Sequence, residues 1–230
     1  MTLDGVELTV CDDAEQVASA VAEELVAAAR SGAAIALTGG TSVGRAYELA
    51  AEREPDWSAA SVWWGDERCV PPDDERSNYR LARETLLDRL EAIPREVQRI
   101  NAELGGEEAA REYDGLLRGM SLELVLLGIG PDGHTASLFP NQPTLDERER
   151  RAIPADATLE PFVERVTLTI PVLSSAPTVV FVVTGDAKAE AVERAFARPP
   201  DSATPASLVR STAGRTRVVA DTAAAARLPR

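Results

Sequence analysis

The sequence predicts a three-layer α/β fold, in which a mostly parallel sheet carries helices on both faces. Short runs of Val, Ile and Leu alternate along the chain with longer segments whose apolar residues recur at helical spacing. Several of these runs end in glycine-rich turns that open a helix, as strands do at the ligand-binding edge of an open sheet. The chain has 230 residues, 44% of them apolar, so we expect one domain over residues 1–230.

The chain begins with a predicted βαβ unit. Val6–Val10 alternates like a short strand, and Asp12 or Asp13 can cap a helix that runs to about Arg30. One face of this helix is apolar at helical spacing: Val17, Val21, Leu25 and Ala29. Ala33–Leu37 is then an apolar run typical of a buried strand.

Four further elements are predicted before residue 120. Val43–Glu52 has helical character, and Ser61–Trp64 is a third short strand. Ser77–Leu90 begins with residues that can cap a helix and has leucines on its inner side. Gly106–Arg118 is a further helix, whose alternating acids and arginines are typical of a solvated surface.

The second half of the chain repeats the alternation of strands and helices. Leu122–Leu127 is a buried strand, and the polar, proline-punctuated segment Asn141–Pro161 predicts a long loop beside the site. Arg165–Ile170 alternates as a strand, and the β-branched strand Thr178–Thr184 precedes a helix over Gly185–Ala197. The remaining predicted elements are short: a turn or helix at Pro171–Ser175, a loop at Arg198–Thr204, a helical piece at Ser207–Val209, a strand at Thr216–Ala220 and an alanine-rich helix capped by Asp221.

Charge and cysteine content exclude several classes of function. A net charge of −14 argues against a nucleic-acid partner, which needs a basic face, but it allows a small anionic ligand held by a few local cations. Cys11 and Cys69 have no metal-like spacing, so we expect free thiols in a reducing compartment. No segment approaches the ~20 apolar residues of a membrane span, and we expect a cytoplasmic monomer.

The stretch Gly128–Pro140 contains the only histidine of the chain, His134. An imidazole with an ordinary pKa near ~6.5 can take up and return a proton at neutral pH. The alternative is a histidine that only caps the turn through Thr135 and Ser137. Because three glycines and Asp132 surround His134 at the end of a predicted strand, the catalytic interpretation is favoured.

A second glycine-rich turn, Thr38-Gly39-Gly40-Thr41-Ser42, lies between a predicted strand and a predicted helix. This arrangement points backbone N–H groups and a helix N-terminus at an anion, usually a phosphate. An ordinary turn with an N-cap is the alternative. The turn matches neither the P-loop nor the GxGxxG fingerprint, so ATP and NAD are not predicted.

Charged residues mark two further strand ends. Asp66, Glu67 and Arg68 follow two tryptophans that must be largely buried, which favours a site over a surface turn. Lys188, the only lysine of the chain, lies in the first turn of a predicted helix, although an ordinary solvated lysine is an equal alternative.

Five segments together resemble the 6-phosphogluconolactonase family in their order and approximate spacing. They are TGGTS, WWGDERCVPPDDERSNYR, LLGIGPDGHTASLFP, RVTLTIP and VTGDAKAEAV, and the similarity extends from about Thr38 to Asp221. The resemblance implies hydrolysis of 6-phospho-D-glucono-1,5-lactone to 6-phosphogluconate, a fold similar to glucosamine-6-phosphate deaminase, and no metal or organic cofactor. Two alternatives stay open: a hexosamine-6-phosphate deaminase or isomerase, and a non-catalytic sugar-phosphate-binding regulator.

Lactone hydrolysis assigns roles to the candidate residues. His134 can act as general base on water and then protonate the leaving ring oxygen, with Asp132 orienting the imidazole. The resemblance places Arg68 in the active site, where it polarises the carbonyl or holds the phosphate. The expected substrate- and phosphate-binding residues are Gly39, Gly40, Thr41, Ser42, Asp66, Asn78, Arg165 and Lys188. Many family members have a serine ahead of the glycines, so the hydroxyl that meets the phosphate is left open.

Overall fold

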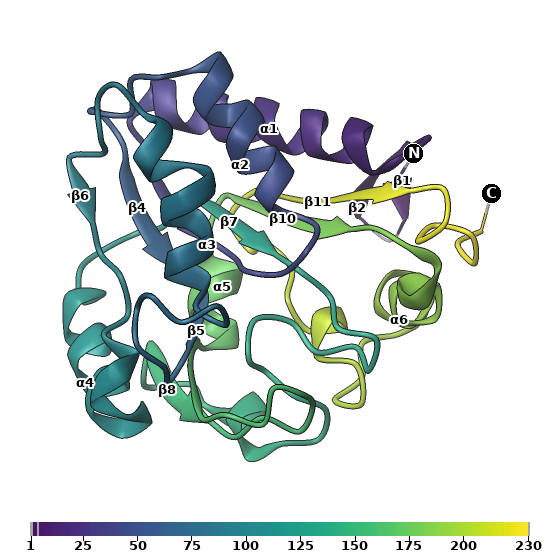
Figure 1. Cartoon of the computed structure of the whole chain (residues 1–230). Coiled ribbons are helices and arrows are strands. Elements are labelled where there is room, and N and C mark those ends of the chain that lie inside the picture. Colours follow the sequence, from purple (N-terminus) through teal and green to yellow (C-terminus); the bar gives the residue numbers. More distant parts are fainter. Residues whose placement is uncertain (1, 4, 230) are drawn as a thin grey trace.

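An eight-stranded sheet forms the centre of the molecule (Figure 1). The computed structural model describes residues 2–3 and 5–229. In spatial order the strands are β1 (Thr2–Leu3), β2 (Val6–Cys11), β11 (Arg215–Asp221), β10 (Thr178–Val183), β7 (Leu124–Leu127), β3 (Ala34–Leu37), β4 (Ser61–Trp64) and β6 (Glu96–Val97). Every neighbouring pair is parallel except β1 with β2, so the predicted mostly parallel sheet is confirmed.

Helices cover both faces of this sheet (Figure 1). The chain moves toward one edge from β2 through β3 to β4, and toward the other edge from β7 through β10 to β11. Because crossovers between parallel strands are right-handed, opposite directions place the connecting helices on opposite faces. The first face carries α1 (Ala14–Ser31), α2 (Gly44–Arg53) and α3 (Asn78–Thr85), and the second carries α4 (Gly106–Leu116), α5 (Ile170–Ser175) and α6 (Ala189–Phe196).

A second, three-stranded antiparallel sheet lies against α4 and was only partly predicted. It consists of β5 (Asp66–Arg68), β9 (Arg165–Leu168) and β8 (Ala152–Ala155), in that order. The expected loop Asn141–Pro161 therefore contains β8, and also the 3₁₀ turn η3 (Pro143–Asp146). Pro154 is tolerated in β8 because β8 is an edge strand, where a missing N–H breaks no ladder.

Two predicted helices differ from the structure. The helix expected to reach Leu90 ends at Thr85, whose hydroxyl donates to the Leu81 carbonyl, and the 3₁₀ turn η1 (Leu87–Arg89) follows. The alanine-rich helix after Asp221 is absent, because residues 222–227 form successive turns. A segment of this length forms few helical hydrogen bonds, and Pro229 cannot extend it. The other short elements are the 3₁₀ turns η2 (Ala102–Leu104), η4 (Asp186–Lys188) and η5 (Pro205–Ser207).

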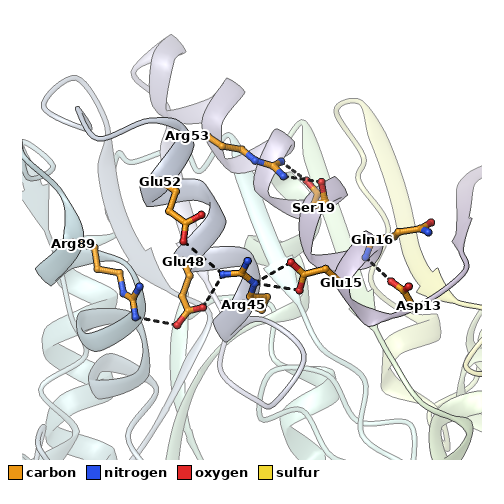
Figure 2. A network of polar contacts seen from close by, with 9 residues as sticks. All are labelled: Asp13, Glu15, Gln16, Ser19, Arg45, Glu48, Glu52, Arg53 and Arg89. Carbon is orange, nitrogen blue, oxygen red and sulfur yellow. Dashed lines mark hydrogen bonds and ion pairs between the residues drawn. The ribbon is translucent and has the colours of Figure 1, made fainter.

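Charged side chains link α1, α2 and η1 on the outer surface (Figure 2). Arg45 of α2 lies 3.0 Å from Glu15 of α1, 3.1 Å from Glu48 and 3.6 Å from Glu52, and Arg89 of η1 also pairs with Glu48. Exposed pairs of this kind contribute little each. The buried apolar faces of α1 and α2 therefore hold these helices on the sheet, and the surface network adds little to this.

Two buried tyrosines close the carboxyl ends of β3 and β4. The Tyr47 hydroxyl donates to the carbonyl of Thr38 at 2.7 Å and accepts from its N–H at 3.1 Å. Tyr113 makes the same pair of contacts with Trp64, at 3.2 Å and 2.9 Å. Burial raises the pKa of both phenols above the ordinary value. Each hydroxyl thus satisfies the last backbone groups of a strand where the chain leaves the sheet for the site.

We expect Tyr47→Phe to lower the free energy of unfolding by about 1–3 kcal/mol, because it leaves two buried backbone groups of Thr38 unpaired. Urea unfolding followed by circular dichroism measures the change. Tyr79→Phe is the matched control, since no hydrogen bond to the Tyr79 hydroxyl is found among the described residues, and it should stay within about 0.5 kcal/mol of the wild type. Equal losses in the two variants would show that the Tyr47 hydroxyl does not stabilise this strand end.

Candidate active site

The candidate site lies at the switch point of the main sheet. Strands β3 and β7 are neighbours, but the chain leaves them in opposite directions, so the loops that follow them separate and leave a cleft. This cleft has a volume of about 270 Å³. The candidate residues that line it come from five segments of the chain: Gly39, Gly40, Thr41, Ser42, Asp66, Arg68, Asn78, His134, Arg165 and Lys188. Of the predicted site residues, Asp132 alone is outside this lining, and it contacts His134.

His134 and Asp132 form a close pair in the loop after β7. The Nδ1 atom of His134 lies 2.6 Å from Oδ1 of Asp132, which also accepts from the His134 backbone N–H at 3.1 Å. Half-burial acts to raise the pKa of Asp132, but the hydrogen bond and charge of His134 hold it below its ordinary range. With Nδ1–H directed at the carboxylate, Nε2 of the imidazole keeps its lone pair for a proton from elsewhere.

The loop around His134 is packed too closely for most side chains. A Cβ atom on Gly130 would lie 2.1 Å from Nδ1 of His134 and 2.6 Å from Oδ1 of Asp132. The imidazole also contacts the ring of Phe139, with the ring centres 4.8 Å apart. The Thr135 hydroxyl does not cap the turn, as the alternative supposed, but donates to the carbonyl of Gly128 at 2.8 Å. Gly130 and Phe139 thus both restrict the space available to the imidazole.

The glycine turn after β3 forms the opposite wall of the cleft. A Cβ on Gly39 would overlap the Asn78 carboxamide, with only 1.8 Å to Oδ1, and Gly40 has φ of +100°. Helix α2 begins at Gly44 after Val43, without a side-chain cap, so the alternative of an ordinary turn with an N-cap does not describe this helix start. The Ser42 hydroxyl lies instead 2.7 Å from that of Thr184, at the end of β10.

Asp66 holds three parts of the site together. One carboxylate oxygen accepts from the Ser137 hydroxyl at 2.6 Å, and the other accepts from Nδ2 of Asn78 at 3.1 Å. Asp66 is 4% exposed, so these contacts compensate its burial. Both oxygens therefore have protein partners, and Asp66 links the β7 loop, through Ser137, to Asn78 beside Gly39.

Glu67, which received no role from the sequence, fixes the start of α3. Its carboxylate accepts from the backbone N–H groups of Arg68, Asn78 and Tyr79 at 2.7–2.8 Å, and from the Ser77 hydroxyl at 3.0 Å. Burial raises the pKa of Glu67, and the three N–H bonds partly offset the rise. A carboxylate at a helix N-terminus also interacts favourably with the helix dipole.

Three cations surround the cleft without forming an ion pair among the described residues. Arg68 and Arg165 are cross-strand partners in β5 and β9, and the Nε atom of each is buried with no hydrogen-bond partner in the described part of the chain. Burial lowers the pKa of Arg165, with Asp66 opposing it, and also lowers that of Lys188, with Asp132 opposing it. Desolvated cations that form no close ion pair are suited to receive an anion.

The sequence missed several residues of the cleft. Leu159 and Glu160 line it from the segment between β8 and β9, where the prolines indicated only a loop. Ser137 and Thr184 act by holding Asp66 and Ser42. Their strand-end positions were visible in the sequence, but their partners lie 71 and 142 residues away along the chain and could not be inferred.

The fold and the cleft define an α/β protein whose ligand-binding edge lies at the switch point of a parallel sheet. The chain belongs to the glucosamine-6-phosphate isomerases/6-phosphogluconolactonase family, whose model matches residues 11–218. Among the relatives, the 6-phosphogluconolactonase of Homo sapiens is 42% identical over 87% of this chain and 82% of its own length.

Solved structures support the same membership. The 6-phosphogluconolactonase from Trypanosoma cruzi superposes with a TM-score of 0.87 over 100% of this chain and 99% of that chain, at 25% identity. A monomeric glucosamine-6-phosphate deaminase shares the fold, with a TM-score of 0.85 over 96% of this chain and 99% of that chain, at 18% identity. In the part of the chain that the structure describes, no helix has both the length and the apolar character needed to cross a membrane.

Proposed function

We propose that this protein hydrolyses 6-phospho-D-glucono-1,5-lactone to 6-phospho-D-gluconate, in the oxidative branch of the pentose phosphate pathway. The proposal depends above all on one observation, the His134–Asp132 pair in a cleft that also contains three cations without ion-pair partners in the described residues. The names of the human and trypanosomal relatives support this substrate. The deaminase neighbour, at 18% identity, supports only the shared fold.

In the proposed mechanism, Nε2 of His134 takes a proton from a water molecule as that water attacks the lactone carbonyl. Asp132 holds the imidazole in the required tautomer and stabilises its charged form. The protonated His134 then gives its proton to the ring oxygen as the C–O bond breaks. Arg68, which lines the cleft, is proposed to stabilise negative charge that develops on the carbonyl oxygen, or to hold the phosphate.

The phosphate group is proposed to bind at the glycine turn and Lys188. Gly39 and Gly40 allow close approach of the backbone, Thr41 and Ser42 carry hydroxyls, and the ammonium group supplies charge. Arg165 is a further candidate, because its guanidinium faces the cleft with an unpaired Nε. Asp66 and Asn78 are assigned to the substrate-binding wall of the cleft.

A coupled assay tests the proposal. Glucose-6-phosphate dehydrogenase generates the lactone in place, and 6-phosphogluconate dehydrogenase reports the acid as a second equivalent of NADPH. Because the lactone also opens spontaneously, rates are compared over short times with and without the protein. No acceleration, together with ammonia release from glucosamine 6-phosphate, would instead assign a deaminase. Binding of 6-phosphogluconate without any turnover would assign a non-catalytic regulator.

We expect Lys188→Ala to raise KM by about tenfold with kcat little changed, because a half-buried ammonium contributes a charge-assisted bond to the phosphate. Initial rates over a range of lactone concentrations separate the two constants. Arg198→Ala is the control, since Arg198 is exposed and pairs with Glu193 on the surface. An unaltered KM in Lys188→Ala would place the phosphate elsewhere in the cleft.

We also propose that the protein acts as a monomer, with one domain over residues 1–230, in the cytoplasm. Cys11 and Cys69 are both free thiols, which suits a reducing compartment. Neither a metal nor an organic cofactor is needed by the proposed mechanism, since the base, its orienting carboxylate and the cations are all side chains. Full activity after dialysis against a chelator is expected.

A further inference from the structure

Asp221 lies at the end of β11 and binds backbone outside its own strand. Both of its carboxylate oxygens accept from the N–H of Gly185, at 2.9 and 3.1 Å, and Oδ1 also accepts from the N–H of Ala224 at 2.7 Å. Asp221 as a whole residue is 8% exposed. The contact with Ala224 is the expected cap of the terminal turns, but the contact with Gly185 reaches a neighbouring strand end and was not predicted.

Gly185 opens the turn that delivers Lys188 to the cleft. Its backbone has φ of +92° and ψ of 150°, a conformation that other residues rarely adopt. The Gly185 carbonyl then accepts from the Lys188 N–H at 3.2 Å in η4. On the other side of Gly185, the Thr184 hydroxyl contacts that of Ser42 in the glycine turn. The Gly185 N–H that Asp221 accepts from is thus three residues from Lys188. The same contact joins the end of β11 to the end of β10.

Asp221 affects Lys188 through the backbone rather than through charge. Burial lowers the pKa of Lys188, and the carboxylate that opposes this effect is that of Asp132, in the β7 loop. The Asp221 carboxylate instead has backbone N–H donors on both oxygens. Its contribution is therefore to fix the conformation of the turn between β10 and α6.

We propose that Asp221 is a positioning residue for phosphate binding, which holds the Gly185–Lys188 turn so that the Lys188 ammonium projects into the cleft. This inference rests on the proposed function, because it assigns Lys188 to the phosphate of the substrate. It predicts that loss of the Asp221 carboxylate weakens substrate binding by no more than the contribution that Lys188 makes to that binding.

The test is a double-mutant cycle of Asp221→Ala and Lys188→Ala in the coupled assay. We expect Asp221→Ala to raise KM about fivefold with kcat nearly unchanged, since the ammonium remains but is no longer held in place. In the Lys188→Ala background the same substitution should leave KM unchanged. A fivefold rise in both backgrounds, or a fall in kcat without a change in KM, would overturn the inference.

Two further variants separate positioning from stability. Asp13→Ala removes a comparable carboxylate, the N-cap of α1 that accepts from Gln16 N–H at 2.9 Å, and it should lower the melting temperature without altering KM. Should Asp221→Ala fail to fold, Gly185→Ala replaces it, because a Cβ there has open space but the positive φ is strained. It is expected to raise KM in the wild-type background alone, and an unchanged KM there contradicts the inference.

A binding measurement distinguishes failure of this inference from failure of the proposed function. Calorimetric titration with 6-phosphogluconate needs no turnover. If the wild type binds this ligand but does not accelerate lactone opening, the proposed activity fails while the cycle can still be measured on Kd. If Asp221→Ala weakens binding about fivefold only where Lys188 is present, the positioning role stands.

Discussion

Replacing His134 with alanine is expected to lower kcat by about two to four orders of magnitude while KM changes little. His134 is the only histidine of the chain, and no other imidazole can take over proton transfer. The His134 Nδ1 atom lies 2.6 Å from Oδ1 of Asp132. The variant therefore removes the base and leaves the Asp132 carboxylate without its imidazole partner. The rate over the spontaneous opening of fresh lactone, taken at short times in the coupled assay, measures the loss.

The same variant should still bind product. Calorimetric titration with 6-phosphogluconate is expected to give a Kd close to that of the wild type, because the glycine turn and Lys188 line the cleft from other segments of the chain and keep their contacts in the variant. Near wild-type turnover in His134→Ala would exclude His134 as the base. A large loss of binding would instead indicate that the imidazole holds the substrate.

Gly130→Ala is expected to lower kcat by about 10²-fold although Gly130 carries no functional group. The added Cβ would overlap Nδ1 and Cε1 of His134, at 2.1 and 2.2 Å, and so displace the imidazole from its present position. A shift of about 1 Å in a catalytic group can cost this much in rate. Kinetic constants from the coupled assay give the effect, and circular dichroism establishes that the variant is folded.

Gly128 offers a matched comparison in the same loop. Neither glycine has a positive φ, so alanine suits the backbone at both, but a Cβ on Gly128 meets no atom within 4 Å. Gly128→Ala should therefore lose far less activity than Gly130→Ala. Similar losses in the two variants would mean that the loop tolerates no side chain at all, and the argument from contact with the imidazole would be wrong.

The main sheet and most of the cleft could be predicted from local patterns. Apolar runs such as Leu124–Leu127 and Ala33–Leu37 are buried on both faces, so they lack alternation and stand out from the amphipathic helices between them. Parallel strands all end at one edge, and the polar residues that follow each run were therefore expected to meet. Ten of the predicted site residues do line one cleft.

The antiparallel sheet and the partners of buried acids could not be predicted in this way. The segment Asp66–Arg68 is a polar strand, whose acids are stabilised by distant donors such as Ser137 and by the N-terminus of α3. Such pairing depends on contacts far apart along the chain, which no local pattern encodes. Asp221 was assigned to a terminal helix for the same reason, because its contact with Gly185 follows from the adjacency of β10 and β11.

Because Lys188 is the only lysine and lines the cleft, an amine-specific reagent can label one side chain of the cleft selectively. Reductive methylation with ¹³C-formaldehyde would place a single side-chain dimethylamine signal in a protein whose other side-chain cations are arginines and one histidine. The chemical shift of that signal against pH gives the pKa of the ammonium group directly, and burial is expected to hold this pKa below the ordinary value for lysine. A phosphorylated ligand that contacts the group should raise it, so one resonance would report occupancy of the site without any assay of turnover.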